Sequence, residues 1–349
     1  MHKLRKTSVL RLCLAFALVC GFGFWVVAPG SALARAQDVS EYAVTRIELA
    51  GDLKRRSAEI SGLTWFADNL IVLPQYPGFA GGGSFLYAIT KDTLDNYLEN
   101  SDALPVEAKK IRFDAGNLAT TIDGYEGFEA IQFVGNKIYL SIEANTAKGM
   151  RSYLVSGVIA DDLSFVKLDT SSLVELVPPI DLRNQSYEAL LAVEDEIVAI
   201  FEANGVIGNK GSEAYSFDYD LNYVGRMSMS PLPYRVTDST LVDEASGTFW
   251  VINYFYPGDK DLDSGSDFVS NNYGKGKTHA ENEQVERLLQ LKYSSNDIVW
   301  TERPPVQLEL SGDVARNWEG LAKLDNRGFI VATDKYPETI LAFVKVDLE

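Results

Sequence analysis

Two stretches of the chain align with each other without a gap: EAIQFVGNKIYLSIEAN at residues 129–145 and EALLAVEDEIVAIFEAN at residues 188–204. Each stretch reads as a strand, a tight turn and a second strand, with the turns at Gly135-Asn136 and Glu194-Asp195. The two copies begin roughly sixty residues apart. Self-similarity at such a period is typical of a repeat architecture.

Three weaker copies extend the repeat: SGLTWFADNLIVLPQ at 61–75, DSTLVDEASGTFWVIN at 238–253, which is the most divergent, and EGLAKLDNRGFIVATD at 319–334. Further strand-like runs lie between the copies, for example at 152–159 and 165–168. Four-stranded units repeated in this way predict an all-β chain that folds as a single β-propeller of five blades. Residues 43–49 can supply the last strand of the fifth blade and close the ring.

A ring of six blades is the alternative, if residues 92–105 or a later insert contain another repeat. The insert covers residues 259–286 and is rich in Gly, Ser, Asn and Asp. We therefore expect it to form a surface loop or lid. His279 lies within this insert, and we expect its side chain to be solvated rather than catalytic.

Residues 1–34 are typical of an export signal. Lys3, Arg5 and Lys6 precede an apolar run at 12–28, and Ala32-Leu33-Ala34 forms a small-x-small cleavage pattern. A membrane anchor is the alternative, because an apolar run of this length is close to the shortest one that spans a bilayer. We expect a mature monomeric domain at 35–349, exported to the periplasm or the medium and without stable membrane insertion.

The mature sequence excludes several kinds of chemistry. Cys13 and Cys20 both lie in the signal, and His279 is the one histidine that follows it. Disulfides, thiolate nucleophiles, Ser–His catalysis and multi-histidine zinc sites are therefore excluded. The formal net charge is −17 for the whole chain and −21 after loss of the four basic residues in 1–34. So acidic a domain repels nucleic acid.

Acidic residues recur at both ends of the repeated hairpins. The start of the first strand and the end of the second strand of a hairpin lie at the same end. We therefore expect three acid pairs at one mouth of the central channel: Glu129 with Glu143, Glu188 with Glu202, and Glu319 with Asp334. The matching positions in the other copies would complete an oxygen-lined ring: Ser61, Gln75, Asp238 and Asn253.

Converging carboxylates repel one another unless they are neutralised. Oxygen ligands without histidine or cysteine suit Ca²⁺, and less often Mg²⁺. We predict a calcium site with these ligands: Glu129, Glu188, Glu319 and Asp334. Glu143 and Glu202 are the predicted catalytic proton acceptors. In the structural alternative, the same acids accept hydrogen bonds from backbone N–H groups and hold the blades together.

Basic residues stand close to these acids. Arg183, Arg235 and Arg316 each precede an acid of the repeat, and Lys335 follows Asp334. Arginine forks match the oxygens of phosphate and carboxylate groups. We therefore predict that these four residues bind the substrate, a small anionic ester. Salt bridges between neighbouring blades are the alternative.

Short motifs of the repeat resemble a known family. GYEGFEAI at 124–131, NWEGLA at 317–322 and GFIVATD at 328–334 resemble the "esterase-like activity of phytase" propellers, and are similar to the SdiA-regulated exported propellers. SGLTW at 61–65 is similar to the opening motif of those families. The resemblance spans roughly residues 55–346. It implies an exported propeller that binds calcium at its channel and acts on phosphate or carboxylic esters, with Glu129, Glu188 and Glu319 as blade-motif glutamates.

Two hypotheses follow. The first is an exported, calcium-dependent, phytase-like hydrolase, in which the metal polarises an ester oxygen and activates water. The second is a non-catalytic propeller that binds a small molecule or a protein at the same mouth, with calcium in a structural role. Propellers host both functions, so the fold does not choose between them.

Overall fold

The computed structural model describes residues 39–205 and 211–348, which belong to one compact unit. Strands dominate this unit, and the predicted all-β fold is confirmed. The predicted export signal and its cleavage site lie outside the described residues. In the described part of the chain, no helix is long and apolar enough to cross a membrane.

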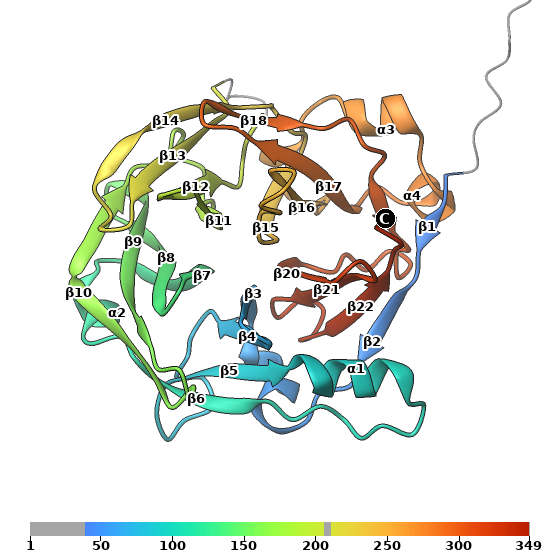
Figure 1. The fold of residues 1–349 in the computed structure, drawn as a ribbon. Helices are drawn as coiled ribbons and strands as arrows, with labels where there is room; N and C mark the ends of the chain where they lie inside the picture. Colours follow the sequence, from blue (N-terminus) through green and yellow to red (C-terminus); the bar gives the residue numbers. More distant parts are fainter. Residues whose placement is uncertain (1–38, 206–210, 349) are drawn as a thin grey trace, which may run out of the picture. The chain divides into compact units, whose positions relative to one another are not determined.

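Three blades of four strands follow one another along the chain (Figure 1). The first blade is β3 (Ile60–Phe66), β4 (Asn69–Pro74), β5 (Phe85–Thr90) and β6 (Lys109–Asp114). The second is β7 (Tyr125–Val134), β8 (Lys137–Thr146), β9 (Gly149–Ile159) and β10 (Phe165–Leu176). The third is β11 (Tyr187–Val193), β12 (Glu196–Phe201), β13 (Glu213–Asp218) and β14 (Tyr223–Met229).

Two further blades complete the ring. The fourth contains β15 (Arg235–Ser239), β16 (Thr248–Phe255) and β17 (Val285–Tyr293), and its outer positions are filled by β18 (Asp297–Trp300) and β19 (Val306–Leu308). The short β1 (Glu41–Tyr42) pairs with β19. The fifth contains β20 (Trp318–Leu324), β21 (Gly328–Thr333), β22 (Leu341–Lys345) and β2 (Val44–Ile47). Because β2 pairs with β22, the N-terminal strand closes the ring as predicted.

Short helices join the strands: η1 (Gly51–Lys54), η2 (Arg56–Ala58), α1 (Lys91–Glu99), α2 (Leu118–Thr121), η3 (Lys260–Leu262), α3 (Phe268–Tyr273) and α4 (Lys277–Glu281). Helix α1 begins after Thr90, whose side chain accepts a hydrogen bond from the backbone of Thr93. Residues 92–105 are therefore a helix and a loop, and the ring has five blades rather than six. The insert at 259–286 contains η3, α3 and α4.

The expectation that His279 is solvated is wrong. Its side chain is 4% exposed, and Nδ1 lies 2.7 Å from Oε1 of Glu41. Nε2 accepts a hydrogen bond from the backbone N–H of Glu286. Burial lowers the pKa of His279, and the bond to Glu41 opposes this. The histidine thus fastens the insert to β1, a contact between residues that are distant in the sequence.

In the described residues, five large apolar clusters lie one between each pair of neighbouring blades, and a small sixth cluster contains Tyr234, Phe255 and Val285. Between the fourth and fifth blades, for example, the ring of Trp250 lies 5.2 Å from the ring of Phe329. Strands that are buried on both faces carry continuous apolar runs, which explains the lack of clear alternation in the inner strands. These inner strands contact one another in the order β3, β7, β11, β15, β20 and back to β3.

Polar side chains tie the inner strands together. The carboxylate of Asp238 on β15 accepts hydrogen bonds from the backbone N–H groups of Leu321 (2.7 Å), Ser239 (2.7 Å) and Leu63 (3.3 Å). Asp238 therefore joins three blades and does not complete an oxygen ring at the mouth. Asn253 and Ser61, by contrast, donate to backbone carbonyls. The contacts of Asp238 are those of the structural alternative.

We expect Asp238→Ala to destabilise the fold strongly. The change leaves three buried N–H groups without an acceptor, and each costs about 1–3 kcal/mol. The free energy of unfolding, measured by urea denaturation, should fall by about 3 kcal/mol or more. Asp238→Asn keeps one acceptor oxygen and should cost less. The exposed Asp102→Ala is the control and should stay within about 0.5 kcal/mol of the wild type. An equally small effect of Asp238→Ala would refute this role.

Candidate active site at the centre of the propeller

β-Bulges place the repeated glutamates. The ladder between β7 and β8 is interrupted between Phe128 and Ala130, so Glu129 is left unpaired. The same interruption falls at Glu188 in β11 and at Glu319 in β20. A bulge bends its strand and redirects a side chain. In this propeller, bulges on three blades carry glutamates that all line the same central cavity.

The bulges also shift the predicted acid pairs. Glu143 lies across the ladder from Gly127, two residues before Glu129. Similarly, the backbone N–H of Glu202 donates to Ser186, two residues before Glu188. The sequence predicted that the two acids of a copy are near cross-strand neighbours. They lie at the same end of the hairpin, but two residues out of register.

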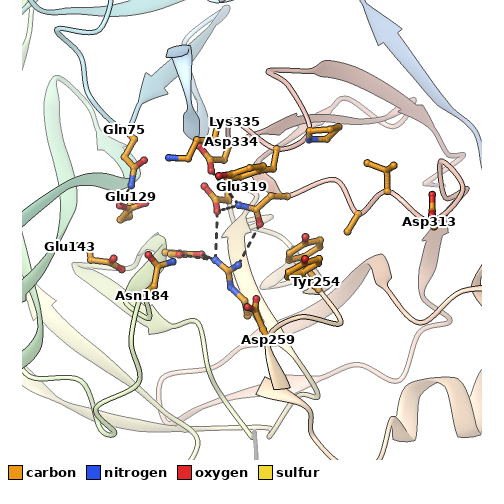
Figure 2. A pocket seen from close by; sticks show the side chains of 18 residues that line it. Gln75, Glu129, Glu143, Asn184, Tyr254, Asp259, Asp313, Glu319, Asp334 and Lys335 are labelled. Atoms are coloured by element: carbon orange, nitrogen blue, oxygen red, sulfur yellow. Dashed lines mark hydrogen bonds and ion pairs between the residues drawn. The ribbon is translucent and has the colours of Figure 1, made fainter. Parts of the chain in front are cut away.

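The acids surround a cavity of about 670 Å³ at the start of the inner strands (Figure 2). Its acidic lining residues are Glu129, Glu143, Glu188, Asp259, Asp313, Glu319 and Asp334. Glu202 is fully buried and does not belong to the lining. The convergence predicted from the repeat is therefore present for five of the six paired acids.

Arg235 is the cation at the centre of this cluster. Its Nε lies 2.5 Å from Oε2 of Glu202, and its Nη2 lies 3.1 Å from Oε1 of Glu188. Glu319 is more distant, with 3.6 Å between Nη2 and Oε1. The guanidinium also lies 5.8 Å from the ring centre of Tyr254. The fourth blade thus contributes an arginine to the centre, where the second, third and fifth blades contribute the repeated glutamates.

Burial raises the pKa of several of these carboxyl groups. The pKa of Glu129 is raised well above its usual range by burial and by the nearby Glu143 and Glu319. Oε1 of Glu129 accepts a hydrogen bond of 2.9 Å from Gln75. Burial and Glu202 raise the pKa of Glu143 in the same way. Among the described residues Glu143 has no ion-pair partner, and the more distant Arg235 only partly opposes the rise in its pKa.

Asn317 joins the two acids of the fifth blade. Its Nδ2 donates to Oε1 of Glu319 at 2.5 Å and lies 3.5 Å from Oδ2 of Asp334. Burial raises the pKa of both carboxyl groups. Oδ1 of Asp334 is buried and has no hydrogen-bond partner among the described residues.

The predicted basic residues divide into two groups. Arg235 and Lys335 line the cavity, and Nζ of Lys335 bonds to Glu59 at 3.0 Å. Arg316 lies outside the lining and is buried against Glu286, with Nη2 of Arg316 2.7 Å from Oε2 of Glu286. Arg183 is exposed and also lies outside the lining. The geometry of Arg316 is that of the salt-bridge alternative.

Sequence reasoning missed three residues. Asn317 and Tyr254 line the cavity, and Glu286, outside the lining, accepts a hydrogen bond from Nε of Arg316. Asn317 precedes Glu319 by two residues, as Ser186 precedes Glu188, so the repeat contained a signal for this position. Tyr254 lies in an apolar stretch at the end of the fourth repeat, and Glu286 stands at the end of the insert. Neither carries a local signal of its contact.

Three carboxylates could bind a metal ion. Oxygens of Glu143, Glu188 and Glu202 all lie within 4.8 Å of one another. Among the predicted calcium ligands, only Glu188 belongs to this group. Arg235 already pairs with two of its three members.

No family model matches the sequence, and no curated protein matches it. Solved structures do match. A putative glycoside hydrolase from Parabacteroides distasonis is 11% identical, covers 90% of this chain and 95% of its own, and has a TM-score of 0.46. The GH43 endo-arabinanase from Bacillus licheniformis is 10% identical, with 86% and 96% covered and a TM-score of 0.46. A luciferin-regenerating enzyme is 10% identical, with 87% and 95% covered and a TM-score of 0.41.

These comparisons correct the family resemblance drawn from the sequence. Glycoside hydrolases, rather than phytase-like or SdiA-regulated propellers, are among the similar structures, and no family model supports the phytase-like motifs. The motifs consist of a bulged glutamate, a glycine and apolar strand residues. The bulged glutamate recurs on three inner strands of the ring, so the motifs reflect the internal repeat of this fold. At these identities the likeness concerns the fold alone.

We expect Glu129→Gln to reduce the pH dependence of stability. An acid whose pKa is raised by folding stabilises the native state below its usual value near 4.5, and this stability is lost as the pH rises through the raised pKa. Between pH 5 and pH 8 in EDTA, the wild type should therefore lose at least about 1 kcal/mol more than the variant, because one pKa unit corresponds to about 1.4 kcal/mol.

Glu129 faces Glu143, Glu319 and Asp334, which remain in the variant, and Gln75 can still donate to the new amide oxygen. Urea denaturation at both pH values measures the difference. The exposed Glu99→Gln is the matched control. Parallel pH profiles for the wild type and Glu129→Gln would show that Glu129 keeps an ordinary pKa.

Proposed function

We propose that this propeller is a hydrolase that cleaves a glycosidic bond in the central cavity, with Glu143 and Glu188 as its carboxyl pair. One observation carries the proposal. Glu143 at the end of β8 and Glu188 on β11 come from adjacent blades, line the same cavity and have oxygens within 4.8 Å of each other. Only Glu188 of the pair contacts a cation, Arg235.

The single arginine separates the roles of the two acids. Burial and Glu202 raise the pKa of Glu188, and Arg235 opposes them. Three carboxyl groups share one arginine, so a proton is most stable on the member that does not touch it, which is Glu143. Acid and nucleophile chemistry requires a neutral acid beside an ionised one, and the contact of Arg235 with Glu188, but not with Glu143, favours this assignment of the two roles.

The reaction can be written with these two residues. Glu143 donates its proton to the glycosidic oxygen as the bond to the anomeric carbon breaks. Glu188 attacks that carbon and forms a covalent ester with the sugar. Glu143 then takes a proton from water, the water oxygen attacks the same carbon, and Glu188 leaves as carboxylate. The short spacing favours this route, because inverting enzymes need about 6.5–9.5 Å between the carboxyl groups to fit a water.

The lining favours a neutral, hydroxyl-rich substrate. Its two basic residues, Arg235 and Lys335, are both paired with carboxylates, so an anionic ester would meet an excess of negative charge. Sugar hydroxyls can donate to the acids, and Asn184 and Asn317 supply amide groups. Three tyrosines supply flat apolar faces for a sugar ring: Tyr254, Tyr256 and Tyr336.

We expect wild-type protein to hydrolyse members of a panel of neutral nitrophenyl glycosides and oligosaccharides. Glu143→Gln and Glu188→Gln should each lower kcat/KM by about a hundredfold or more, the range for loss of an acid–base group. A dinitrophenyl glycoside has a leaving group that needs no proton, so it should largely restore bond cleavage in Glu143→Gln but not in Glu188→Gln.

The exposed Glu99→Gln is the control and should keep the wild-type rate. If both active-site variants also keep it, the assignment of Glu143 and Glu188 is refuted. Saturable sugar binding without turnover by the wild type would instead favour the non-catalytic, ligand-binding propeller.

A second candidate is a calcium site at the three converging carboxylates of Glu143, Glu188 and Glu202, which keeps only Glu188 of the calcium ligands predicted from the sequence. Their oxygen ligands fit a hard cation. Bound calcium would compete with Arg235 for Glu188 and Glu202, and it would supply the positive charge that an anionic ester needs in this cavity. The proposal of an anionic ester substrate therefore depends on the proposal that calcium binds here.

We expect calcium, if it binds here, to raise the melting temperature by several degrees. Binding to the native state alone stabilises by about 2.7 kcal/mol at a hundredfold excess over Kd. Thermal melts with calcium and with EDTA measure this, and Glu202→Gln should abolish the difference while Glu99→Gln should not. Identical melts in both conditions, with no calcium in the purified protein by elemental analysis, would exclude the site.

A further inference from the structure

A second cavity, of about 600 Å³, lies at the other end of the inner strands. β20 begins beside the central cavity with Glu319, and four residues later Lys323 lines the second cavity. A strand rises about 3.3 Å per residue, so the two sites are about 13 Å apart along this strand. Trp65 near the end of β3 and Thr240 just after β15 also belong to the second cavity.

The basic residues of this cavity are unpaired. Neither the guanidinium of Arg303 nor the ammonium of Lys323 forms an ion pair with any residue that the structure describes. Its two acids are engaged elsewhere. Asp243 accepts hydrogen bonds from the backbone and hydroxyl of Ser246, and Asp325 lies 2.9 Å from Nζ of Lys91. This is the reverse of the central cavity, where the lining cations are paired and acids are in excess.

Rigid aromatic rings stand beside these cations. The guanidinium of Arg303 lies 5.4 Å from the ring centre of Trp250, which packs edge-on against Phe329. Nε1 of Trp65 donates a 2.9 Å hydrogen bond to the backbone carbonyl of Lys323. The amide oxygen of Gln290 is occupied by Thr301, which leaves its NH₂ group as a further donor.

We propose that this cavity binds a small ligand in which an oxyanion, such as a carboxylate, is attached to a planar ring. An arginine fork, an ammonium and an amide NH₂ offer only donors, which match the several acceptor oxygens of an oxyanion. The indole of Trp65 offers a flat apolar face for the ring. On a chain with a net charge of −17, two cations without an ion-pair partner among the described residues are the groups of this cavity that attract an anion. This site is independent of the proposed glycosidase.

Isothermal titration calorimetry with 1-naphthoate tests the proposal. We expect saturable binding that weakens with added salt, and binding of the neutral 1-naphthalenemethanol that is at least tenfold weaker. 1-Naphthyl phosphate distinguishes a carboxylate site from a general oxyanion site, and inorganic phosphate alone should bind weakly because it has no ring. Equal affinity for naphthoate and its neutral analogue would overturn the proposal.

Variants of the lining residues test whether naphthoate binds in this cavity. Lys323→Gln and Arg303→Gln should each weaken naphthoate binding severalfold, and the double variant at least tenfold. Asp325→Asn removes a negative charge from the lining and should strengthen binding. Its left-handed backbone, with φ of 51°, is one that asparagine tolerates. The exposed Arg55→Gln, outside this lining, is the matched control for loss of a positive charge.

Two further measurements keep the result interpretable. Arg303 packs on Trp250, so the melting temperature of each variant shows whether the fold is intact, and Lys323→Gln tests the charge without that packing. Glu143→Gln should leave naphthoate binding unchanged. Loss of binding in Glu143→Gln, or unchanged binding in the double variant, would place the ligand elsewhere and overturn the proposal.

Discussion

The buried ion pair between Arg235 and Glu202 is the interaction on which the centre of this propeller depends. Arg235 on the fourth blade reaches Glu202 and Glu188 on the third and approaches Glu319 on the fifth. Charges removed from water cost several kcal/mol each, and this cost is offset only where their partners are close. One arginine therefore neutralises acids from two other blades. Its positive charge opposes the rise in pKa that burial causes in Glu188, Glu202 and Glu319.

The inner strands divide their polar residues between two levels. At the start of the strands, bulges turn glutamates into the cavity, where they are available for chemistry. Further along the strands, side chains such as Asp238 accept hydrogen bonds from backbone N–H groups of other blades. At this second level, hydrogen bonds between blades hold the ring together, and they also give the buried acid Asp238 the partners that a buried polar group needs. This allows the first level to keep acids such as Asp334 incompletely paired.

The two ends of the same strands differ in their free charges. The central cavity has more acids than cations, and both of its cations are paired. The second cavity has two cations that form no ion pair with a described residue, and one of them, Arg303, packs on the indole ring of Trp250. The inner strands of a propeller run side by side through its centre. A few residues along one strand therefore separate a cavity rich in acids from a cavity with unpaired cations. The ligands that we propose follow this difference, with a neutral sugar in the first cavity and an anionic ring in the second.

The sequence by itself determined the architecture of this protein: repeated hairpins predicted a five-bladed propeller closed by residues 43–49, and acids at matching hairpin ends predicted their convergence at one mouth. These features follow from local periodicity and turn chemistry. Only the tertiary structure decided the partners. The bulges move Glu143 opposite Gly127, Arg235 rather than Asp238 enters the cavity, Glu286 captures Arg316, and Glu41 buries His279. Each of these contacts joins residues on different strands or blades, and a contact between distant segments leaves no periodic pattern in either one.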